Sequence, residues 1–152
     1  MRKFRVRRHP DDGVLILRGL PTIVFLTVCT AQKQKGLANG QVQKALSESW
    51  NTADTWLVGL YMIMPDHIHL FCWPQSEDYE IEQWITFWKR EFRRVIGNKA
   101  PRFQPRGFHH RLRNDESYDE KWNYVRDNPV RAGLVDDADD WPYQGFLHES
   151  CM

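Results

Sequence analysis

The chain has 152 residues, enough for one compact domain with a substantial hydrophobic core. Its formal net charge of +1 hides an uneven distribution, because residues 1–113 carry 18 Lys and Arg against 10 Asp and Glu, whereas residues 114–152 carry 3 against 10. The basic part favours a polyanionic partner. The apolar runs are too short for a membrane span. The three cysteines form no close pair in the sequence, which argues against a disulfide framework and favours a cytoplasmic location.

The first half of the chain predicts a strand, a helix and two further strands. Residues 22–30 are rich in β-branched and aromatic side chains, and residues 39–50 carry apolar side chains at helical spacing. Residues 55–64 and 67–73 are predicted strands, and the Pro65-Asp66 pair between them is a turn signal.

The clearest helix is predicted after this strand pair. An apolar stripe with i, i+3, i+4, i+7 spacing runs over residues 81–96. Ser76 or Asp78 is expected to cap its first turn, and Gly97 to end it.

A fourth strand and a last helix are predicted in the second half. Residues 108–113 follow a loop rich in Pro and Arg. Ser117 and Glu120 have the spacing of a capping box, which opens the helix. The helix is expected to end at or before Asn128, because the following Pro129 disfavours α conformation at that residue.

The order of these elements predicts an α+β fold. A β-α-β-β-α-β order is the ferredoxin-like arrangement, an antiparallel sheet with two helices on one face. The additional C-terminal helix is the candidate to cover the other face of the sheet.

The third strand carries the first candidate functional residues. Side chains alternate across a strand, so His67 and His69 share the open face while Ile68 and Leu70 point toward the two helices. Two imidazoles at i, i+2 form half of a divalent metal site. The alternative is that both are ordinary, half-buried strand residues.

The last helix carries the second set. Tyr118, Trp122 and Val125 form its packing stripe, whereas Tyr124 and Asn128 lie together away from that stripe. If this helix covers the open face of the sheet, Asn128 approaches the histidines as an oxygen ligand of Mg²⁺ or Mn²⁺. Tyr124 would then stand beside the metal as a nucleophile toward a phosphodiester. Taken alone, the pair is more typical of a surface tyrosine and a helix-ending asparagine.

Two blocks of sequence resemble the HUH single-tyrosine transposases. Tyr61-Met-Ile-Met-Pro-Asp-His-Ile-His-Leu70 is similar to their HUH segment, and Tyr124-Val-Arg-Asp-Asn-Pro-Val-Arg-Ala-Gly-Leu-Val135 to their tyrosine helix. Gly107-Phe-His-His-Arg-Leu-Arg113 and Asp140-Trp-Pro-Tyr143 resemble the REP-associated branch of this family. The similarity runs over residues 21–145.

The resemblance implies a DNA transposase that cleaves and rejoins single-stranded DNA near hairpin-forming repeats. Position by position, Tyr124 would be the catalytic nucleophile, and His67, His69 and Asn128 the metal ligands. The implied reaction passes through a 5′-phosphotyrosine with Mg²⁺ or Mn²⁺ as the cofactor, and the enzyme would act as a monomer or a homodimer. The implied organisation is a basic arm over residues 1–20, a catalytic domain over 21–133 and an acidic segment over 134–152.

Basic side chains are the candidates for contacts with this DNA, since Arg suits both phosphate contacts and base stacking. They are Arg5, Arg7, Arg8, Lys89, Arg90, Arg93, Arg94, Arg111 and Arg113. Each cluster alone is more typical of a solvated surface, and a non-catalytic single-stranded nucleic-acid-binding protein on the same fold is the alternative function. A hydrolase that uses water as the nucleophile would leave Tyr124 without a role.

Overall fold

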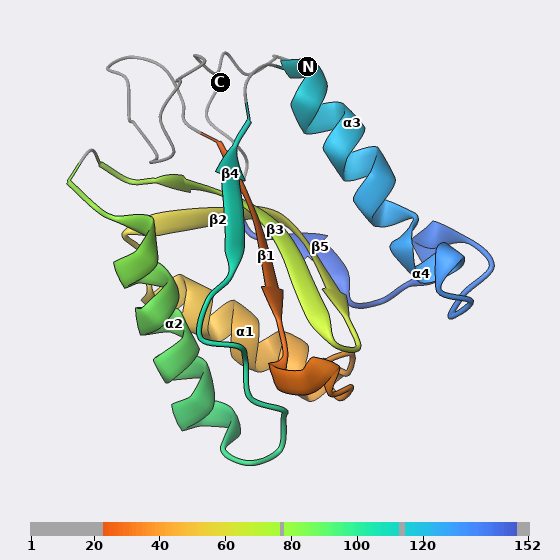
Figure 1. Cartoon of the computed structure of the whole chain (residues 1–152), viewed down its shortest axis with the longest axis horizontal. Helices are drawn as coiled ribbons and strands as arrows, with labels where there is room; N and C mark the ends of the chain where they lie inside the picture. Colours follow the sequence, from red (N-terminus) through yellow and green to blue (C-terminus); the bar gives the residue numbers. More distant parts are fainter. Residues whose placement is uncertain (1–22, 77, 113–114, 149–152) are drawn as a thin grey trace.

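The computed structural model describes residues 23–76, 78–112 and 115–148 (Figure 1). The main elements in chain order are β1 (Val24–Cys29), α1 (Gly40–Thr52), β2 (Trp56–Met64), β3 (His67–Pro74), α2 (Ile81–Ile96), β4 (Phe108–Arg111), α3 (Asp115–Arg126), α4 (Asn128–Arg131) and β5 (Gln144–Phe146). Short 3₁₀ turns, η1 (Ala31–Lys33) and η2 (Ala138–Asp140), join them. The predicted β-α-β-β-α-β order with a further C-terminal helix is confirmed.

The sheet has the strand order β4-β1-β3-β2-β5, and every neighbouring pair is antiparallel. The central strand β3 is therefore flanked on both sides. His69 lies opposite Thr27 of β1 and Met62 of β2, and His67 lies opposite Cys29 and Met64. The histidines thus stand in the middle of the sheet, where the backbone is held by two ladders of hydrogen bonds.

One face of the sheet is covered by α1 and α2. Ile68, Leu70 and Cys72 of β3 join the apolar cluster beneath these helices, as the alternation of the strand predicts. The start of α2 corrects an expectation: its N-cap is Glu80, with no side-chain hydrogen bond, so neither Ser76 nor Asp78 caps the helix. Its end is as predicted, since Gly97 takes a positive φ of 63°.

The other face is partly covered by α3 (Figure 1). Tyr118 stacks on Phe71 with 4.4 Å between ring centroids, Trp122 lies 6.2 Å from the same ring, and Val125 is buried. The predicted packing stripe is thus confirmed. Because α3 begins at Asp115, Ser117 lies inside the helix and the predicted capping box is wrong.

Helix α3 ends before Asn128, as the sequence predicts, but a second helix follows directly and contains Pro129. Helix α3 ends at Arg126, but α4 begins at once with Asn128 and has Pro129 in its first turn. Proline is tolerated there because the first helical residues need no N–H donor. The proline therefore closes one helix and starts the next.

The C-terminal region packs on the domain. Strand β5, which the sequence did not predict, pairs with β2 through Gly145 opposite Tyr61. Trp141 is buried in the cluster under α3 and donates from Nε1 to the Ile63 carbonyl at 3.0 Å. The acidic segment thus adds a strand and an anchor to the domain. The predicted arm over residues 1–20 lies outside the described residues, and no helix in the described part is long and apolar enough to cross a membrane.

Candidate metal and tyrosine site

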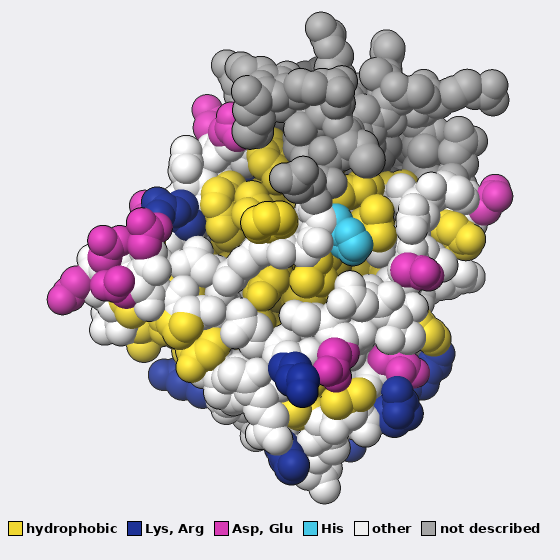
Figure 2. Space-filling model, turned by 180° about the vertical axis from the view of Figure 1, so that it is seen from behind, with side chains coloured by type: hydrophobic (Ala, Val, Ile, Leu, Met, Phe, Trp, Pro, Cys, Tyr) yellow, Lys and Arg dark blue, Asp and Glu magenta, His cyan; other side chains and the backbone are white. Residues whose placement is uncertain are grey.

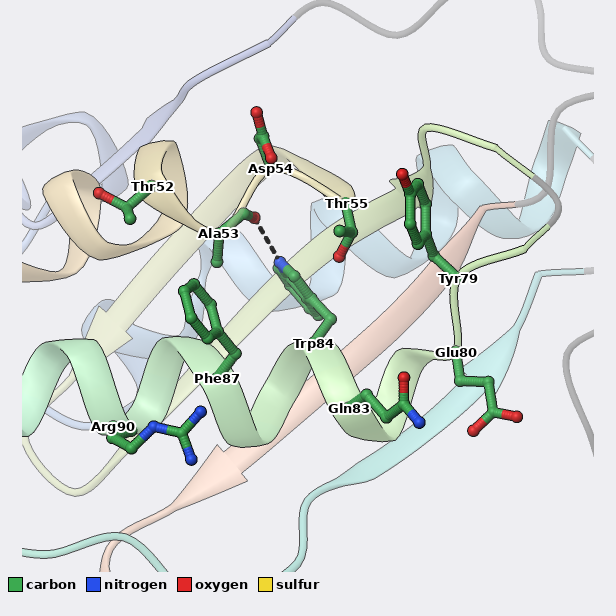
Figure 3. A pocket seen from close by; sticks show the side chains of 10 residues that line it. All are labelled: Thr52, Ala53, Asp54, Thr55, Tyr79, Glu80, Gln83, Trp84, Phe87 and Arg90. Atoms are coloured by element: carbon green, nitrogen blue, oxygen red, sulfur yellow. Dashed lines mark hydrogen bonds between the residues drawn. The ribbon is translucent and has the colours of Figure 1, made fainter.

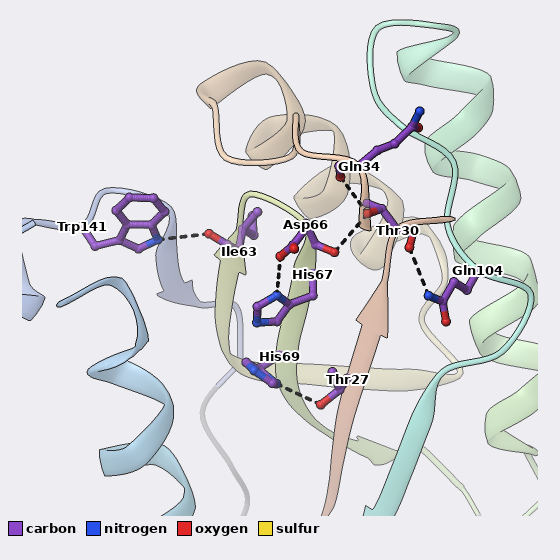
Figure 4. A network of polar contacts seen from close by, with 9 residues as sticks. All are labelled: Thr27, Thr30, Gln34, Ile63, Asp66, His67, His69, Gln104 and Trp141. Carbon is purple, nitrogen blue, oxygen red and sulfur yellow. Dashed lines mark hydrogen bonds and ion pairs between the residues drawn. The ribbon is translucent and has the colours of Figure 1, made fainter. Parts of the chain in front are cut away.

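His67 and His69 of β3 face the side of the sheet that carries α3. Their ring centroids are 4.8 Å apart, with the rings nearly perpendicular. Figure 4 shows both imidazoles on the same side of the strand, toward the segment that holds Trp141. The predicted pair therefore exists as a pair, because two residues along one strand return a side chain to the same face.

Each imidazole is held by a hydrogen bond at Nδ1. The Nδ1 of His67 lies 2.7 Å from Oδ1 of Asp66, and that of His69 lies 2.9 Å from Oγ1 of Thr27. Partners of this kind fix the ring and leave Nε2 as the nitrogen that can bind a metal. Both rings are thus oriented as metal ligands usually are.

The β2–β3 turn that carries Asp66 is tied to the end of β1. The backbone N–H of Thr30 donates to the Asp66 carbonyl at 3.0 Å, and its hydroxyl lies 3.2 Å from the same oxygen (Figure 4). Thr30 is fully buried. The carboxylate beside His67 therefore stands on a fixed backbone.

His69 is held in its neutral form. Burial, together with the nearby charges of His67 and Lys121, lowers the pKa of His69 to about 3. Phe25 stacks on the imidazole with 5.3 Å between centroids, and the Nζ of Lys121 lies 5.3 Å from the centre of the Phe25 ring. Neutral imidazole is the form that ligates metals, so the donors present fit a divalent cation.

Two nitrogen donors do not complete a site. The described residues hold no group of three or more His, Cys, Asp or Glu side chains that could bind a metal. A further protein ligand from this part of the chain would therefore be of another type, such as the amide oxygen predicted at Asn128. That oxygen accepts a hydrogen bond from Arg131, and its role as a ligand stays a prediction.

Tyr124 points away from the packing face of α3, as predicted. Its side chain is 64 % exposed. The guanidinium carbon of Arg131 lies 4.0 Å from the centre of its ring, and Nη2 of Arg131 donates to the Tyr124 carbonyl at 2.8 Å. The same nitrogen donates to Oδ1 of Asn128. The guanidinium of Arg131 thus contacts both Tyr124 and Asn128, which the sequence predicts to lie together.

Arg131 is a further residue beside Tyr124 that was not predicted from the sequence. Tyr124, Asn128 and Arg131 have i, i+4, i+7 spacing, and the two short helices keep that phase across Asp127. Extending the helical face by one turn would have found it.

The basic residues of α2 do not flank the histidines. Because α2 packs on the Ile68 face, it lies across the sheet from the site. Lys89 donates to the Gln104 carbonyl at 2.8 Å, and Arg93 donates to the carbonyls of Gly97, Ala100 and Pro101. These side chains fasten the loop after α2 and lie away from the histidine pair.

The remaining basic candidates are distributed differently. Arg94 pairs with Glu91 at 2.8 Å, Arg90 lies over Phe87 at 5.8 Å, and Arg111 is in the edge strand β4. Arg5, Arg7, Arg8 and Arg113 lie outside the described residues. Figure 2 shows the molecule from behind, with acidic side chains gathered at the end that carries α3, α4 and η2. Contacts of the basic residues with DNA stay a prediction.

A pocket of about 370 Å³ lies elsewhere, between the turn after α1 and the first half of α2 (Figure 3). Trp84 forms part of its wall and donates from Nε1 to the Ala53 carbonyl at 2.7 Å. Tyr79, Phe87 and Arg90 line it as well. These residues belong to the face of the sheet that α1 and α2 cover, here called the helical face. The pocket is therefore separate from the histidine pair, which lies on the other face.

Comparison with known proteins confirms the resemblance found in the motifs. No protein-family profile matches the chain. It is 30 % identical over 90 residues to the REP-associated tyrosine transposase of Escherichia coli K12, covering 59 % of this chain and 53 % of that protein. It is 32 % identical over 99 residues to a putative REP-associated tyrosine transposase of Haemophilus influenzae, covering 55 % of each. The matches thus span about half the length of these curated relatives.

Solved structures share the fold. A REP-associated tyrosine transposase bound to a REP hairpin superposes with a TM-score of 0.71 at 24 % identity, covering 91 % of this chain and 79 % of that one. A putative transposase from Deinococcus radiodurans superposes with a TM-score of 0.51 at 17 % identity, covering 74 % and 95 %. The α+β architecture therefore agrees with that of these proteins.

Proposed function

We propose that this chain is a REP-associated tyrosine transposase, a single-strand DNA endonuclease that also rejoins the strands it cuts. The similarity to two curated proteins of that name supports the proposal, as does the shared fold with a relative bound to a REP hairpin. The proposed substrate is single-stranded DNA that carries hairpin-forming repeats. Such an enzyme works on the chromosome, so we place it in the cytoplasm.

The observation that carries the proposal is the joint arrangement of β3 and α3. His67 and His69 are held at Nδ1 with Nε2 left to bind a cation, on the face of the sheet that α3 covers. That helix carries Tyr124, which is exposed although its neighbours on the packing stripe are not. A protein that only binds nucleic acid needs neither feature.

The proposed chemistry is a transesterification in which bonds and protons balance. The hydroxyl oxygen of Tyr124 attacks the phosphorus, the bond from phosphorus to the 3′ oxygen breaks, and the phenolic proton ends on the departing 3′-hydroxyl. The DNA then stays attached through its 5′ phosphate, and the reverse attack by a 3′-hydroxyl rejoins the strand. Mg²⁺ or Mn²⁺ held by His67, His69 and Asn128 would polarise the phosphate and stabilise its developing charge.

The test is covalent capture of DNA by the full chain with Mg²⁺ or Mn²⁺. The probe is a single-stranded oligonucleotide copied from a palindromic repeat that flanks the gene, with a label at its 3′ end. The label should migrate with the wild-type protein on a denaturing gel and be lost from Tyr124→Phe by more than about a thousandfold. Binding of the uncut oligonucleotide should be unchanged in that variant.

The matched control is Tyr79→Phe, since Tyr79 is also exposed but lies at the pocket on the helical face. It should form the adduct at the wild-type rate. If the wild-type protein binds the oligonucleotide and forms no adduct, the chain is a binding protein and the proposed enzyme function is wrong.

A further inference from the structure

We propose that Arg131 is a positioning residue that acts as a latch: it fixes the ring of Tyr124 and competes with a divalent cation for the amide oxygen of Asn128. The latch rests on the proposed function, because it assumes that Tyr124 attacks and that Asn128 is a ligand. It adds a control element to that site. Three contacts of one guanidinium carry the proposal.

The first two contacts fix the tyrosine. The guanidinium carbon stands 4.0 Å from the ring centre, a distance at which a cation is attracted to the face of an aromatic ring. The hydrogen bond from Nη2 to the Tyr124 carbonyl anchors the same group to the backbone at 2.8 Å. An exposed tyrosine would otherwise sample several rotamers, so these contacts select one of them.

The third contact engages the predicted ligand. Nη2 also donates to Oδ1 of Asn128. A divalent cation on that oxygen would stand beside the positive guanidinium, and like charges at such a separation repel. A cation can therefore use Asn128 fully only when the guanidinium gives up this one hydrogen bond, whereas the contacts with the Tyr124 ring and carbonyl can remain.

The backbone beneath the latch is rigid. The N–H of Arg131 donates to the Asp127 carbonyl at 2.9 Å, and that of Ala132 donates to the Asn128 carbonyl at 2.9 Å. Pro129 between them is buried, and Gly133 closes the turn with φ of 75°. Release of Asn128 is thus a movement of one side chain.

If Arg131 acts as this latch, Arg131→Gln should change Mn²⁺ affinity and the rate of adduct formation in opposite directions. Removing the competing charge should tighten Mn²⁺ binding, by about tenfold if the charged hydrogen bond is lost. Freeing the Tyr124 ring should slow adduct formation at saturating metal and DNA, also by about tenfold. A variant that merely damages the fold would weaken both.

The experiment compares wild type, Arg131→Gln, Arg131→Lys and Arg126→Gln. Mn²⁺ affinity is measured by electron paramagnetic resonance without DNA, and the adduct rate in a single turnover with the repeat oligonucleotide. Lysine keeps the charge but lacks the planar fork, so Arg131→Lys should keep the wild-type Mn²⁺ affinity and lose adduct rate. Arg126 pairs with Asp139 on η2, so Arg126→Gln should leave both values unchanged.

A third readout separates the latch from the proposed function. In protein with ¹³C-labelled tyrosine rings, the Tyr124 signal, assigned with Tyr124→Phe, should shift in Arg131→Gln without any DNA present. An unshifted signal, or Mn²⁺ affinity that stays equal or falls, overturns the latch. If the wild-type chain binds Mn²⁺ and the Tyr124 signal shifts in Arg131→Gln, but the wild-type chain forms no adduct, the proposed enzyme function is wrong and the contacts of Arg131 with Tyr124 still stand.

Discussion

On one face of the sheet, α1 and α2 enclose a broad cluster of buried apolar residues in which Trp84 and Trp88 are almost completely shielded. On the other, α3 covers Phe71 and its neighbours with a smaller cluster and leaves His67 half-buried at its edge. The apolar area buried on the first face is the main source of the stability of the fold. The second carries side chains that hydrogen-bond one another in pairs.

This difference indicates how the two tasks are divided. Burial under α1 and α2 helps to hold the central strand, so His67 and His69 on its reverse side need not be chosen for packing, although Phe71 on that side still packs under α3. Thr27 and Asp66 can then serve the imidazoles. Substitutions on the two faces test whether stability and site chemistry are separated in this way.

Trp84→Ala should have the largest effect on stability. The side chain stacks on Trp56 at 6.1 Å, meets Trp88 at 6.1 Å and donates to the Ala53 carbonyl, so truncation leaves both a cavity and an unpaired carbonyl. The free energy of unfolding should fall by about 3–5 kcal/mol, measured by urea denaturation.

The matched change on the other face is Trp122→Ala. Trp122 is half-buried and lies 6.2 Å from the Phe71 ring, so its loss should lower the free energy of unfolding by only about 1–2 kcal/mol. Equal losses for the two variants would show that the faces share the burden of stability.

Asp66→Ala should have the next largest effect, on metal affinity. The carboxylate fixes the Nδ1 of His67, and removing such a partner weakens metal binding by about 10–100-fold. The Mn²⁺ affinity of Asp66→Asn should lie between those of wild type and Asp66→Ala, because an amide oxygen accepts the same hydrogen bond without the charge. Mn²⁺ titration followed by electron paramagnetic resonance measures all three, and an unchanged affinity in Asp66→Ala would remove this carboxylate from the proposed metal site.

The sequence predicts most of this fold because its signals are periodic and long. The alternation of β3 separates His67 from Ile68, and the stripe of α3 separates Tyr124 from Val125; the structure confirms both. Strand β5 has three residues directly after a proline-containing turn, which is too short for a period to appear.

The partners of the site could not be predicted because they depend on register and on side-chain direction. Thr27 meets His69 only because β1 and β3 pair in one register. Arg93 has the pattern of a solvated basic face, yet its long side chain turns back to the carbonyls at the end of α2. Spacing along one helix shows neither arrangement.

Trp141→Phe should have a moderate effect that tests how the C-terminal region is anchored. Phenylalanine keeps most of the ring but removes the donor to the Ile63 carbonyl, and an unpaired buried carbonyl costs about 1–2 kcal/mol. Trp84→Phe removes the equivalent indole hydrogen bond on the helical face and should cost a similar amount. Urea denaturation of both variants checks this, and a much smaller loss for Trp141→Phe would show that β5 and its anchor contribute little to stability.

Tyr118→Phe should have the smallest effect, confined to alkaline solution. Burial, with a contribution from the charge of Asp119, raises the pKa of Tyr118 to about 12, whereas the unfolded phenol ionises near 10. Between these values the unfolded chain binds fewer protons than the native one, so wild-type stability falls as the pH rises from 10 to 12. Phenylalanine keeps the stack on Phe71 and removes the ionisation. Urea midpoints at pH 9 and pH 11 should therefore differ less in Tyr118→Phe than in wild type, whereas equal differences would place the Tyr118 hydroxyl in water and contradict the close packing of α3 on the sheet.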